Sequence, residues 1–152
     1  IWAAQYDENT LKPTNARTFE PASISGGESV AIVRFLMGVK QPSKEVIDAV
    51  ENAIAWYQKQ KITGHRVERK AAPDDRKYSF IKDAAAKRVW GRFYEMETMR
   101  PILVGRDAVI KYDIKDIEAE RAGGYTWYVN SPESLIEKDY PKWKSRLASS
   151  KP

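Results

Sequence analysis

The sequence contains no cysteine and a single histidine, His65, among its 152 residues. Without cysteine the chain has no disulfide bond, no thiolate nucleophile and no thiolate ligand for a metal ion. One histidine cannot supply the usual ligands of a zinc site, and no nucleophile-elbow motif accompanies it. We therefore interpret His65 as a surface or loop residue. The absence of cysteine leaves the cellular compartment open.

Long hydrophobic runs are also missing. The longest apolar segment, residues 29–39, contains Arg34 and is shorter than the roughly 18 to 20 residues of a membrane span. Hydrophobic residues make up 42% of the chain and charged residues 31%, as in ordinary folded proteins. We expect residues 1–152 to form one domain segment ending in a flexible tail at 149–152. The start at Ile1, without methionine, indicates a processed, truncated or engineered chain.

Basic residues exceed acidic residues only moderately. The formal net charge is +5 and the pI is about 9.3, which favours an anionic partner such as nucleic acid, a membrane surface or an acidic polysaccharide. The chain has no block of five or six basic residues, so charge alone does not choose among these partners.

The strongest periodic patterns are helical and lie in the first half of the chain. Residues 43–61 repeat apolar side chains at helical spacing, with charged side chains between them. This helix is expected to bury Val46, Ile47, Val50, Ala53, Ile54 and Tyr57. A largely buried helix is expected from about Ser29, with Glu28 near its positive end.

Elsewhere the apolar runs are short. The long segment 7–27 is rich in turn-forming residues and contains Arg17, and long ordered loops are often functional. The patterns that follow predict small ribbons and short helices. Strands are expected at residues 65–70 and 76–81, joined by a turn at 72–75, and at 101–104 and 109–114. Helical segments are expected at 115–123 and 131–148.

The residues that suggest chemistry are arginines set among aromatic and acidic side chains in residues 90–107. Arginine offers a planar fork that binds carboxylate or phosphate through two hydrogen bonds, and it stacks on aromatic rings. The simplest interpretation is structural ion pairing with Glu95, Glu97 and Asp107. Single-stranded nucleic acid also fits basic residues among aromatic rings, although no known nucleic-acid motif is present. A glycosidase pair formed by Glu95 and Glu97 is disfavoured, as is a phosphate loop at Gly26–Gly27.

Three stretches, residues 25–38, 90–107 and 117–143, resemble in order and spacing the pectate lyases of polysaccharide lyase family 10. The resemblance covers nearly all of residues 2–144 and corresponds to the C-terminal half of the catalytic module. The sequence departs from the family pattern at Ala108, where glycine is expected, and at Tyr6, where histidine is expected.

The resemblance implies a mainly α fold, part of an α/α toroid (an incomplete (α/α)3 barrel) with long ordered loops and short strands. It also implies calcium-dependent β-elimination on polygalacturonate, with an arginine as the base. We assign the base to Arg17, with Arg34 as the competitor. We predict that Arg92, Arg106, Tyr94 and Arg100 bind the substrate. Glu95 and Asp107 are predicted to orient the arginine guanidinium groups.

The calcium ligands of the family are expected outside this segment, mainly in an N-terminal half and in the substrate. That half is expected as a further part of the module or as a second chain. The predicted partner is polygalacturonate, and the predicted location is secreted or periplasmic. The alternatives are a non-catalytic acidic-polysaccharide-binding segment and, less favoured, a single-stranded nucleic-acid-binding module.

Overall fold

The structure is a computed structural model that describes residues 1–70 and 77–149. The turn expected at 72–75 and residues 150–152 of the expected tail lie outside the described residues. The helices are α1 (Ser29–Met37), α2 (Lys44–Gln60), η1 (Ile114–Asp116), α3 (Ala119–Gly124), α4 (Ser131–Ser134), η2 (Leu135–Asp139) and α5 (Tyr140–Ser149). The strands are β1 (Ile24–Ser25), β2 (His65–Lys70), β3 (Lys77–Lys82), β4 (Trp90–Gly91), β5 (Phe93–Tyr94), β6 (Leu103–Val104), β7 (Ile110–Lys111) and β8 (Tyr128–Val129).

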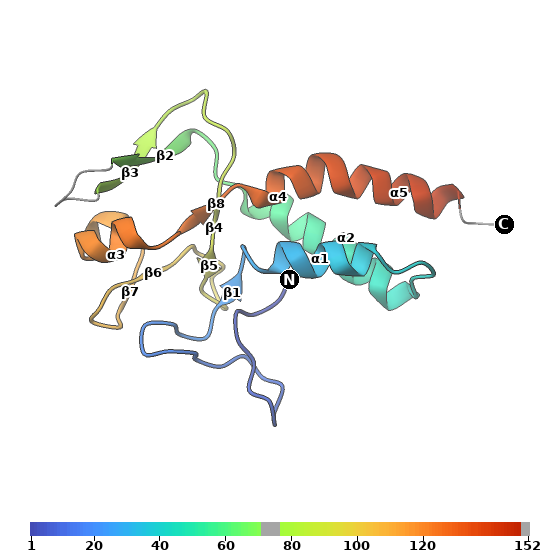
Figure 1. The fold of residues 1–152 in the computed structure, drawn as a ribbon, viewed down its shortest axis with the longest axis horizontal. Coiled ribbons are helices and arrows are strands. Elements are labelled where there is room, and N and C mark those ends of the chain that lie inside the picture. Colours follow the sequence, from blue (N-terminus) through green and yellow to red (C-terminus); the bar gives the residue numbers. More distant parts are fainter. Residues whose placement is uncertain (71–76, 150–152) are drawn as a thin grey trace.

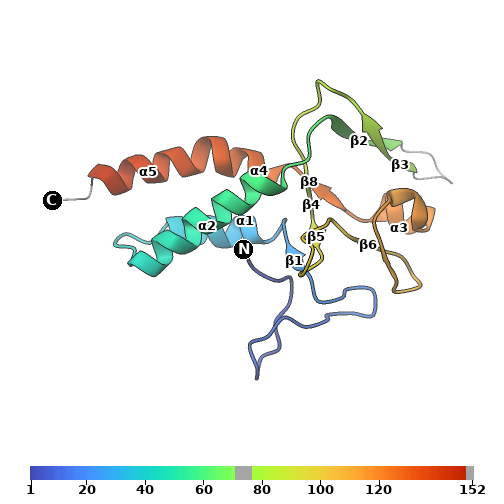
Figure 2. The same cartoon turned by 180° about the vertical axis from the view of Figure 1, so that it is seen from behind.

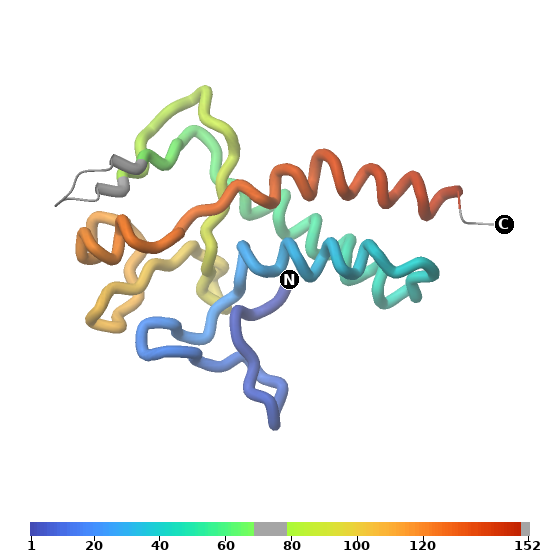
Figure 3. The backbone as a smooth tube through the Cα atoms, in the orientation of Figure 1, coloured from blue at the N-terminus to red at the C-terminus, as the bar shows by residue number. Residues whose placement is uncertain are grey.

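The helices α1, α2, α4 and α5 gather at one end of the molecule, while the ribbons and α3 lie at the other end (Figure 1). The same separation is visible from behind (Figure 2). The backbone trace shows residues 1–25 as two loop excursions below the helices (Figure 3). One of these loops lies beside the loop between β6 and β7, where the guanidinium of Arg106 is 5.2 Å from the centre of the Phe19 ring.

The helix α2 forms where its periodicity predicts. Ser43 caps the N-terminus by accepting a hydrogen bond from the Val46 amide at 3.5 Å, and the predicted apolar side of the helix packs against the core. Its fully buried members are Val50, Ala53, Ile54 and Tyr57, while Val46 and Ile47 are partly buried. The predicted helix from Ser29 is also confirmed as α1.

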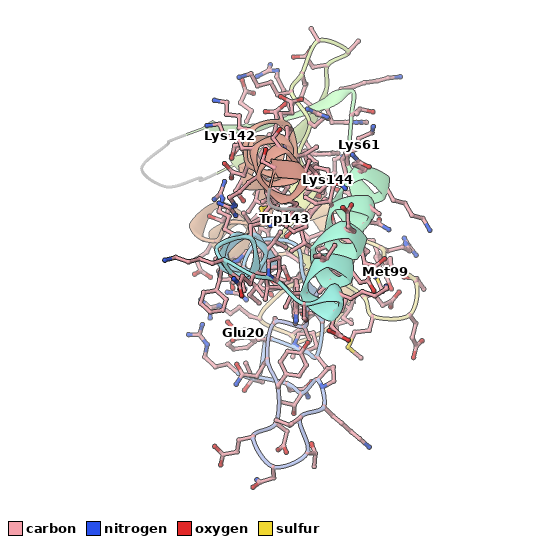
Figure 4. The ribbon with its side chains drawn as sticks, turned by 90° about the vertical axis from the view of Figure 1, so that its right-hand side faces the viewer. Glu20, Lys61, Met99, Lys142, Trp143 and Lys144 are labelled. Atoms are coloured by element: carbon pink, nitrogen blue, oxygen red, sulfur yellow. The ribbon has the colours of Figure 1, made fainter. Side chains whose placement is uncertain are left out.

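The main core lies between the helices and β4. Trp143 of α5 and Trp90 of β4 are 2% and 0% exposed and pack with residues of α1 and α2. Figure 4 looks onto the helical end and shows Trp143 among the helices, with Glu20 on the loop side below them. A smaller core beneath the ribbons includes Leu103, Ile114 and Trp127.

The strands pair as small ribbons, as the sequence predicts for 65–70 with 76–81 and for 101–104 with 109–114. Among the described residues they form four two-stranded antiparallel sheets: β1 with β5, β2 with β3, β4 with β8, and β6 with β7. The helix expected at 115–123 is split, because η1 ends at Asp116 and α3 begins at Ala119. The segment 131–148 is helical throughout, with a π-helical stretch at η2.

The predicted fold class is wrong. A mainly α chain forming part of an α/α toroid requires helical hairpins arranged around a central groove. In the described part of the chain, however, the helices α1, α2 and η2 pack at one end only, and small antiparallel sheets make up the rest. The physical reason is that residues 77–130 hold only short, aromatic-rich apolar runs, which pair as ribbons and cannot sustain long helices. No helix in residues 1–70 or 77–149 combines the length and apolar composition needed to cross a membrane.

Candidate functional site

A pocket of about 210 Å³ lies where the loop containing Arg17 meets β5, β6 and α3. Its charged lining consists of three guanidinium groups and two carboxylates, which leaves one positive charge in excess; these residues are Arg17, Arg92, Arg121, Glu20 and Glu28. Its aromatic lining consists of Phe19, Phe93, Tyr125 and Trp127. The combination of arginine forks with aromatic rings suits a planar anion carried on a ring-shaped body.

Arg17 stands on a tight turn. The Ala16 amide donates to the Glu20 carbonyl at 2.9 Å, and the Glu20 amide donates to the Arg17 carbonyl at 2.8 Å. The side chain is 79% exposed and holds the Glu20 carboxylate with two bonds, Nε to Oε2 at 3.1 Å and Nη2 to Oε1 at 2.7 Å. The hydrogen bonds that Arg17 donates to Glu20 raise the pKa of Arg17 and lower the pKa of Glu20. In this state Arg17 is fully protonated.

Arg92 is positioned by backbone hydrogen bonds to two other segments of the chain. Its amide donates to the Trp127 carbonyl at 2.8 Å, and the Gly26 amide donates to the Arg92 carbonyl at 2.8 Å. The guanidinium bonds the Glu28 carboxylate, with Nε 2.9 Å from Oε1, and lies 5.0 Å from the centre of the Tyr125 ring. Burial acts to lower the pKa of Arg92, but the bond to Glu28 outweighs it and raises this pKa overall.

Glu28 therefore takes the orienting role that the sequence predicted for Glu95. It sits at the N-terminus of α1 and also accepts a hydrogen bond from the Ser25 hydroxyl, so both of its oxygens are engaged. Burial acts to raise the pKa of Glu28, while Arg92 and Ser25 lower it and prevail. The sequence identified Glu28 only as a helix-terminal charge.

Arg106 does not line the pocket itself but stands on the loop between β6 and β7, next to the pocket residue Phe19. Its guanidinium bonds Glu120 of α3, with Nη2 2.8 Å from Oε1, and lies 5.2 Å from the centre of the Phe19 ring. Asp107, the predicted orienting residue, instead bonds Lys111, with Nζ 2.8 Å from Oδ2. The fork of Arg106 is thus held by Glu120, and Asp107 shapes the β6–β7 loop.

Arg121 is the site residue that sequence reasoning missed. It belongs to α3, is only 9% exposed, and donates through Nε to the Val104 carbonyl at 3.0 Å. Its guanidinium lies 4.5 Å from the centre of the Tyr125 ring and 5.2 Å from that of Trp127. The available signal was spacing, because Tyr125 follows Arg121 by four residues.

Arg100, Glu95 and Tyr94 are not brought to this pocket. Arg100 stacks on Tyr112, 3.7 Å from the ring centre, and both residues line a separate pocket. Glu95 accepts hydrogen bonds from the Thr98 and Tyr112 hydroxyls, which lower its pKa. Tyr94 is 0% exposed, and its hydroxyl accepts a hydrogen bond from the Gly91 amide at 2.8 Å. Tyr94 therefore supports the backbone next to Arg92 and offers no surface to a ligand.

Arg34, the competing base, lies at the helical end. Its Nε bonds Asp139 at 2.8 Å and its Nη2 bonds the Ser134 hydroxyl at 2.9 Å, so it joins α1 to the C-terminal helices. It does not line the pocket.

The site does not contain a ready calcium centre. Within residues 1–70 and 77–149 there is no group of three or more Asp, Glu, His or Cys side chains that could hold a metal ion. The two pocket carboxylates, Glu20 and Glu28, each bond an arginine. These residues alone do not fit calcium, which prefers six to eight oxygen ligands.

The geometry combines arginine forks and aromatic rings in one pocket. Residues 1–136 match the family model of pectic acid lyase, and the chain belongs to this family. The resemblance drawn from the sequence is thus confirmed.

Two solved structures of a family 10 polysaccharide lyase from Cellvibrio cellulosa are similar to the chain. One is 30% identical with a TM-score of 0.80, over 97% of this chain and 44% of that one. The other is an aspartate-to-alanine mutant in complex with trigalacturonic acid; it is 30% identical with a TM-score of 0.78, over 93% of this chain and 43% of that one. The chain therefore spans less than half the length of the solved structures it matches. No curated protein matches it.

Proposed function

We propose that this chain forms the uronate-binding and proton-abstracting part of a pectate lyase, which cleaves polygalacturonic acid by β-elimination. Membership of the pectic acid lyase family supports a polysaccharide lyase, and the trigalacturonic acid complex of the Cellvibrio relative supports an acidic sugar chain as ligand. The observation that carries the proposal is the pocket where Arg17, Arg92 and Arg121 meet.

The reaction needs cations beside a carboxylate. A base removes the C5 proton next to the carboxylate, the electron pair forms a double bond between C4 and C5, and the C4–O4 bond breaks. The departing chain takes up a proton at O4. Positive groups at the carboxylate stabilise the charge that develops when the proton leaves. We assign this role to Arg92 and Arg106, whose forks Glu28 and Glu120 hold in place.

Arg17 is the proposed base because its side chain is exposed and lines the same pocket as Arg92. The hydrogen bond to Glu20 favours the protonated form of Arg17. The bound substrate must therefore displace Glu20 before Arg17 can remove the C5 proton. Desolvation by bound substrate and the nearby positive charges of Arg92 and Arg121 then favour the neutral guanidine. Arg17 would thus become basic only in the complex.

The decisive test follows the ultraviolet absorbance of the unsaturated uronide product on polygalacturonate with added calcium. Arg17→Ala is expected to lower the rate at least about a hundredfold, as for loss of a general base. Arg34→Ala removes the same charge outside the pocket and is expected to leave the rate unchanged. Full activity in Arg17→Ala would show that another residue is the base.

Calcium dependence stays a prediction of the family resemblance. The described residues do not form a calcium site, so we propose that the ligands come from the substrate and from a part of the module outside this segment. That part would belong to the same protein or to a second chain. Because the polymer is extracellular, we also propose a secreted or periplasmic location.

A second candidate function is non-catalytic binding of acidic polysaccharide. It is favoured by two observations together: the cationic pocket is present, while a metal-ligand cluster is not found among the described residues. This function predicts retention on a pectate affinity gel without any product absorbance. Retention together with product formation would exclude it.

A further inference from the structure

A second pocket, here called the His65 pocket, has a volume of about 470 Å³, within the range of roughly 300–1,000 Å³ typical of ligand sites. Chain neighbours divide between it and the Arg17 pocket. Trp127 and Ile102 line the Arg17 pocket, whereas Tyr128 and Pro101 line the His65 pocket. Successive side chains of an extended chain point to opposite faces, so the two pockets open on opposite faces of the ribbons. The β2–β3 ribbon and the loops of residues 1–25 accordingly lie on opposite sides of β8 and α3 (Figure 1).

A row of three stacked rings lines the His65 pocket. His65 of β2 stacks on Phe80 of β3, with ring centres 4.6 Å apart and planes at 2°. Phe80 stacks in turn on Tyr128 of β8, at 4.8 Å and 15°. The Nδ1 atom of His65 donates to the Thr63 carbonyl at 3.1 Å, which fixes the orientation of the imidazole. The rings therefore form a preformed apolar surface with few rotatable bonds to order when a ligand packs on it.

Two cations and one carboxylate also line this pocket, namely Arg100, Lys115 and Asp113. The guanidinium of Arg100 lies 3.7 Å from the centre of the Tyr112 ring, and this stacking orients its plane. Within residues 1–70 and 77–149, the side chains of Arg100 and Lys115 make no hydrogen bond or ion pair. Asp113 uses Oδ1 to accept a hydrogen bond from the Lys115 amide at 3.0 Å. With His65 neutral, the pocket has one positive charge in excess and two cationic groups available to an anion.

We infer that the His65 pocket is a second, non-catalytic binding site for an acidic saccharide. The sugar ring packs against the row of aromatic rings, and its carboxylates meet Arg100 and Lys115. The pocket chemistry requires an anion with an apolar ring face, and the choice of a uronate chain rests on the proposed function. A chain of uronates held at both faces would have a raised effective concentration at the Arg17 pocket.

The test uses His65 itself. It is the sole histidine of the sequence, so its ring protons give one set of nuclear magnetic resonance signals that reports on this pocket. The full chain is titrated with trigalacturonate at constant pH and ionic strength, with a chelator present to prevent calcium-dependent cleavage. A saturable shift of the His65 signals is expected, and a neutral trisaccharide of the same length should give none.

Three variants assign the shift to the pocket. Arg100→Met/Lys115→Met is expected to weaken the binding seen at His65 by roughly tenfold, as for loss of charge-assisted hydrogen bonds. Asp113→Asn can keep the hydrogen bond from the Lys115 amide but removes the negative charge, so it should strengthen binding. Arg92→Met removes a cation from the Arg17 pocket and should leave the His65 titration unchanged.

Circular dichroism checks that each variant folds, and Lys115→Met alone replaces the double variant if that variant does not fold. The inference is overturned if the wild type shows no saturable shift. It is also overturned if the shift survives in Arg100→Met/Lys115→Met and is lost in Arg92→Met, because binding would then occur at the Arg17 pocket. An equal shift with sulfate at the same ionic strength would reject a saccharide site. Product formation without a His65 shift removes the second site and keeps the lyase, whereas a shift without product formation keeps the second site and removes the lyase.

Discussion

At the scale of single residues, the backbone conformation of Ala108 shows why glycine suits the position at which the family resemblance leads us to expect it. Ala108 has a φ of +59°, in the left-handed region that favours glycine, and it is exposed on the β6–β7 loop. A non-glycine residue there is strained by roughly 1–2 kcal/mol. The glycine expected at this position from the resemblance would relieve that strain.

We therefore expect Ala108→Gly to stabilise the protein by roughly 0.5–1 kcal/mol, since the extra freedom of glycine in the unfolded chain offsets part of the gain. Urea unfolding followed by circular dichroism measures the change. The matched control is Ala55→Gly on the exposed side of α2, which is expected to destabilise by about 1 kcal/mol. A loss of stability in both variants would contradict the strain argument.

Glu28 gives a second prediction at this scale. Its pKa is lowered in the folded protein by Arg92 and Ser25, so its ionised form stabilises the fold above the unfolded pKa of about 4.3. This contribution is lost as the pH falls through the lower folded pKa. The stability difference between wild type and Glu28→Gln should thus be present at about pH 7 and shrink below about pH 4.

A double-mutant comparison checks this assignment. In an Arg92→Met background the principal partner of Glu28 is gone, so Glu28→Gln should have a smaller pH-dependent effect. An effect of equal size in both backgrounds would show that Arg92 does not set the pKa of Glu28.

At the scale of elements, two buried tryptophans of the main core differ in their hydrogen bonding. The Trp90 indole of β4 donates to the Tyr57 carbonyl of α2 at 2.8 Å. The Trp143 indole of α5 has no hydrogen-bond partner among the described residues. Both are almost fully buried, so replacement by phenylalanine removes similar volume from the same core.

The expected outcome is that Trp90→Phe destabilises the protein by about 1–3 kcal/mol more than Trp143→Phe, because it leaves the Tyr57 carbonyl unpaired. Denaturant unfolding of the two variants measures the difference. Equal losses would mean that packing alone holds α2 to β4.

Local patterns predicted the elements better than their arrangement. The helix α2 repeats apolar residues at its own period, so neighbouring residues suffice to predict it. The toroid was wrong because the fold depends on distant pairings, such as Ile24 with Tyr94 and Trp90 with Val129. Nothing in either short segment specifies its partner.

The same distinction applies to the site. The arginine-rich stretch and the loop of Arg17 were predicted, and the structure brings Arg17 and Arg92 to one pocket. Glu28 and Arg121 were missed because each resembles an ordinary helix-surface charge in sequence. Only the pairing of β1 with β5 and of β4 with β8 places them beside Arg92 and the aromatic rings.

At the scale of the whole molecule, the net charge of +5 and the pocket arginines predict how pectate binding responds to ions. Guanidinium–carboxylate attraction at partly exposed sites is screened by salt, with a Debye length of about 10 Å at 0.1 M and about 3 Å at 1 M. A metal cluster is not found in the part of the chain that the structure describes. Binding by this chain should therefore depend on ionic strength and not on calcium.

Retention of the chain on a pectate affinity gel tests this expectation. Raising sodium chloride from about 0.1 M to about 1 M should release the chain, because screening removes most of the long-range attraction. Adding a chelator at constant low ionic strength should leave retention unchanged, although it should stop any cleavage if calcium assists the reaction. A neutral polysaccharide gel serves as the control and should not retain the chain. Release by chelator at low salt would instead mean that a metal ion bridges protein and polymer, and the arginine pocket would lose its leading role in binding.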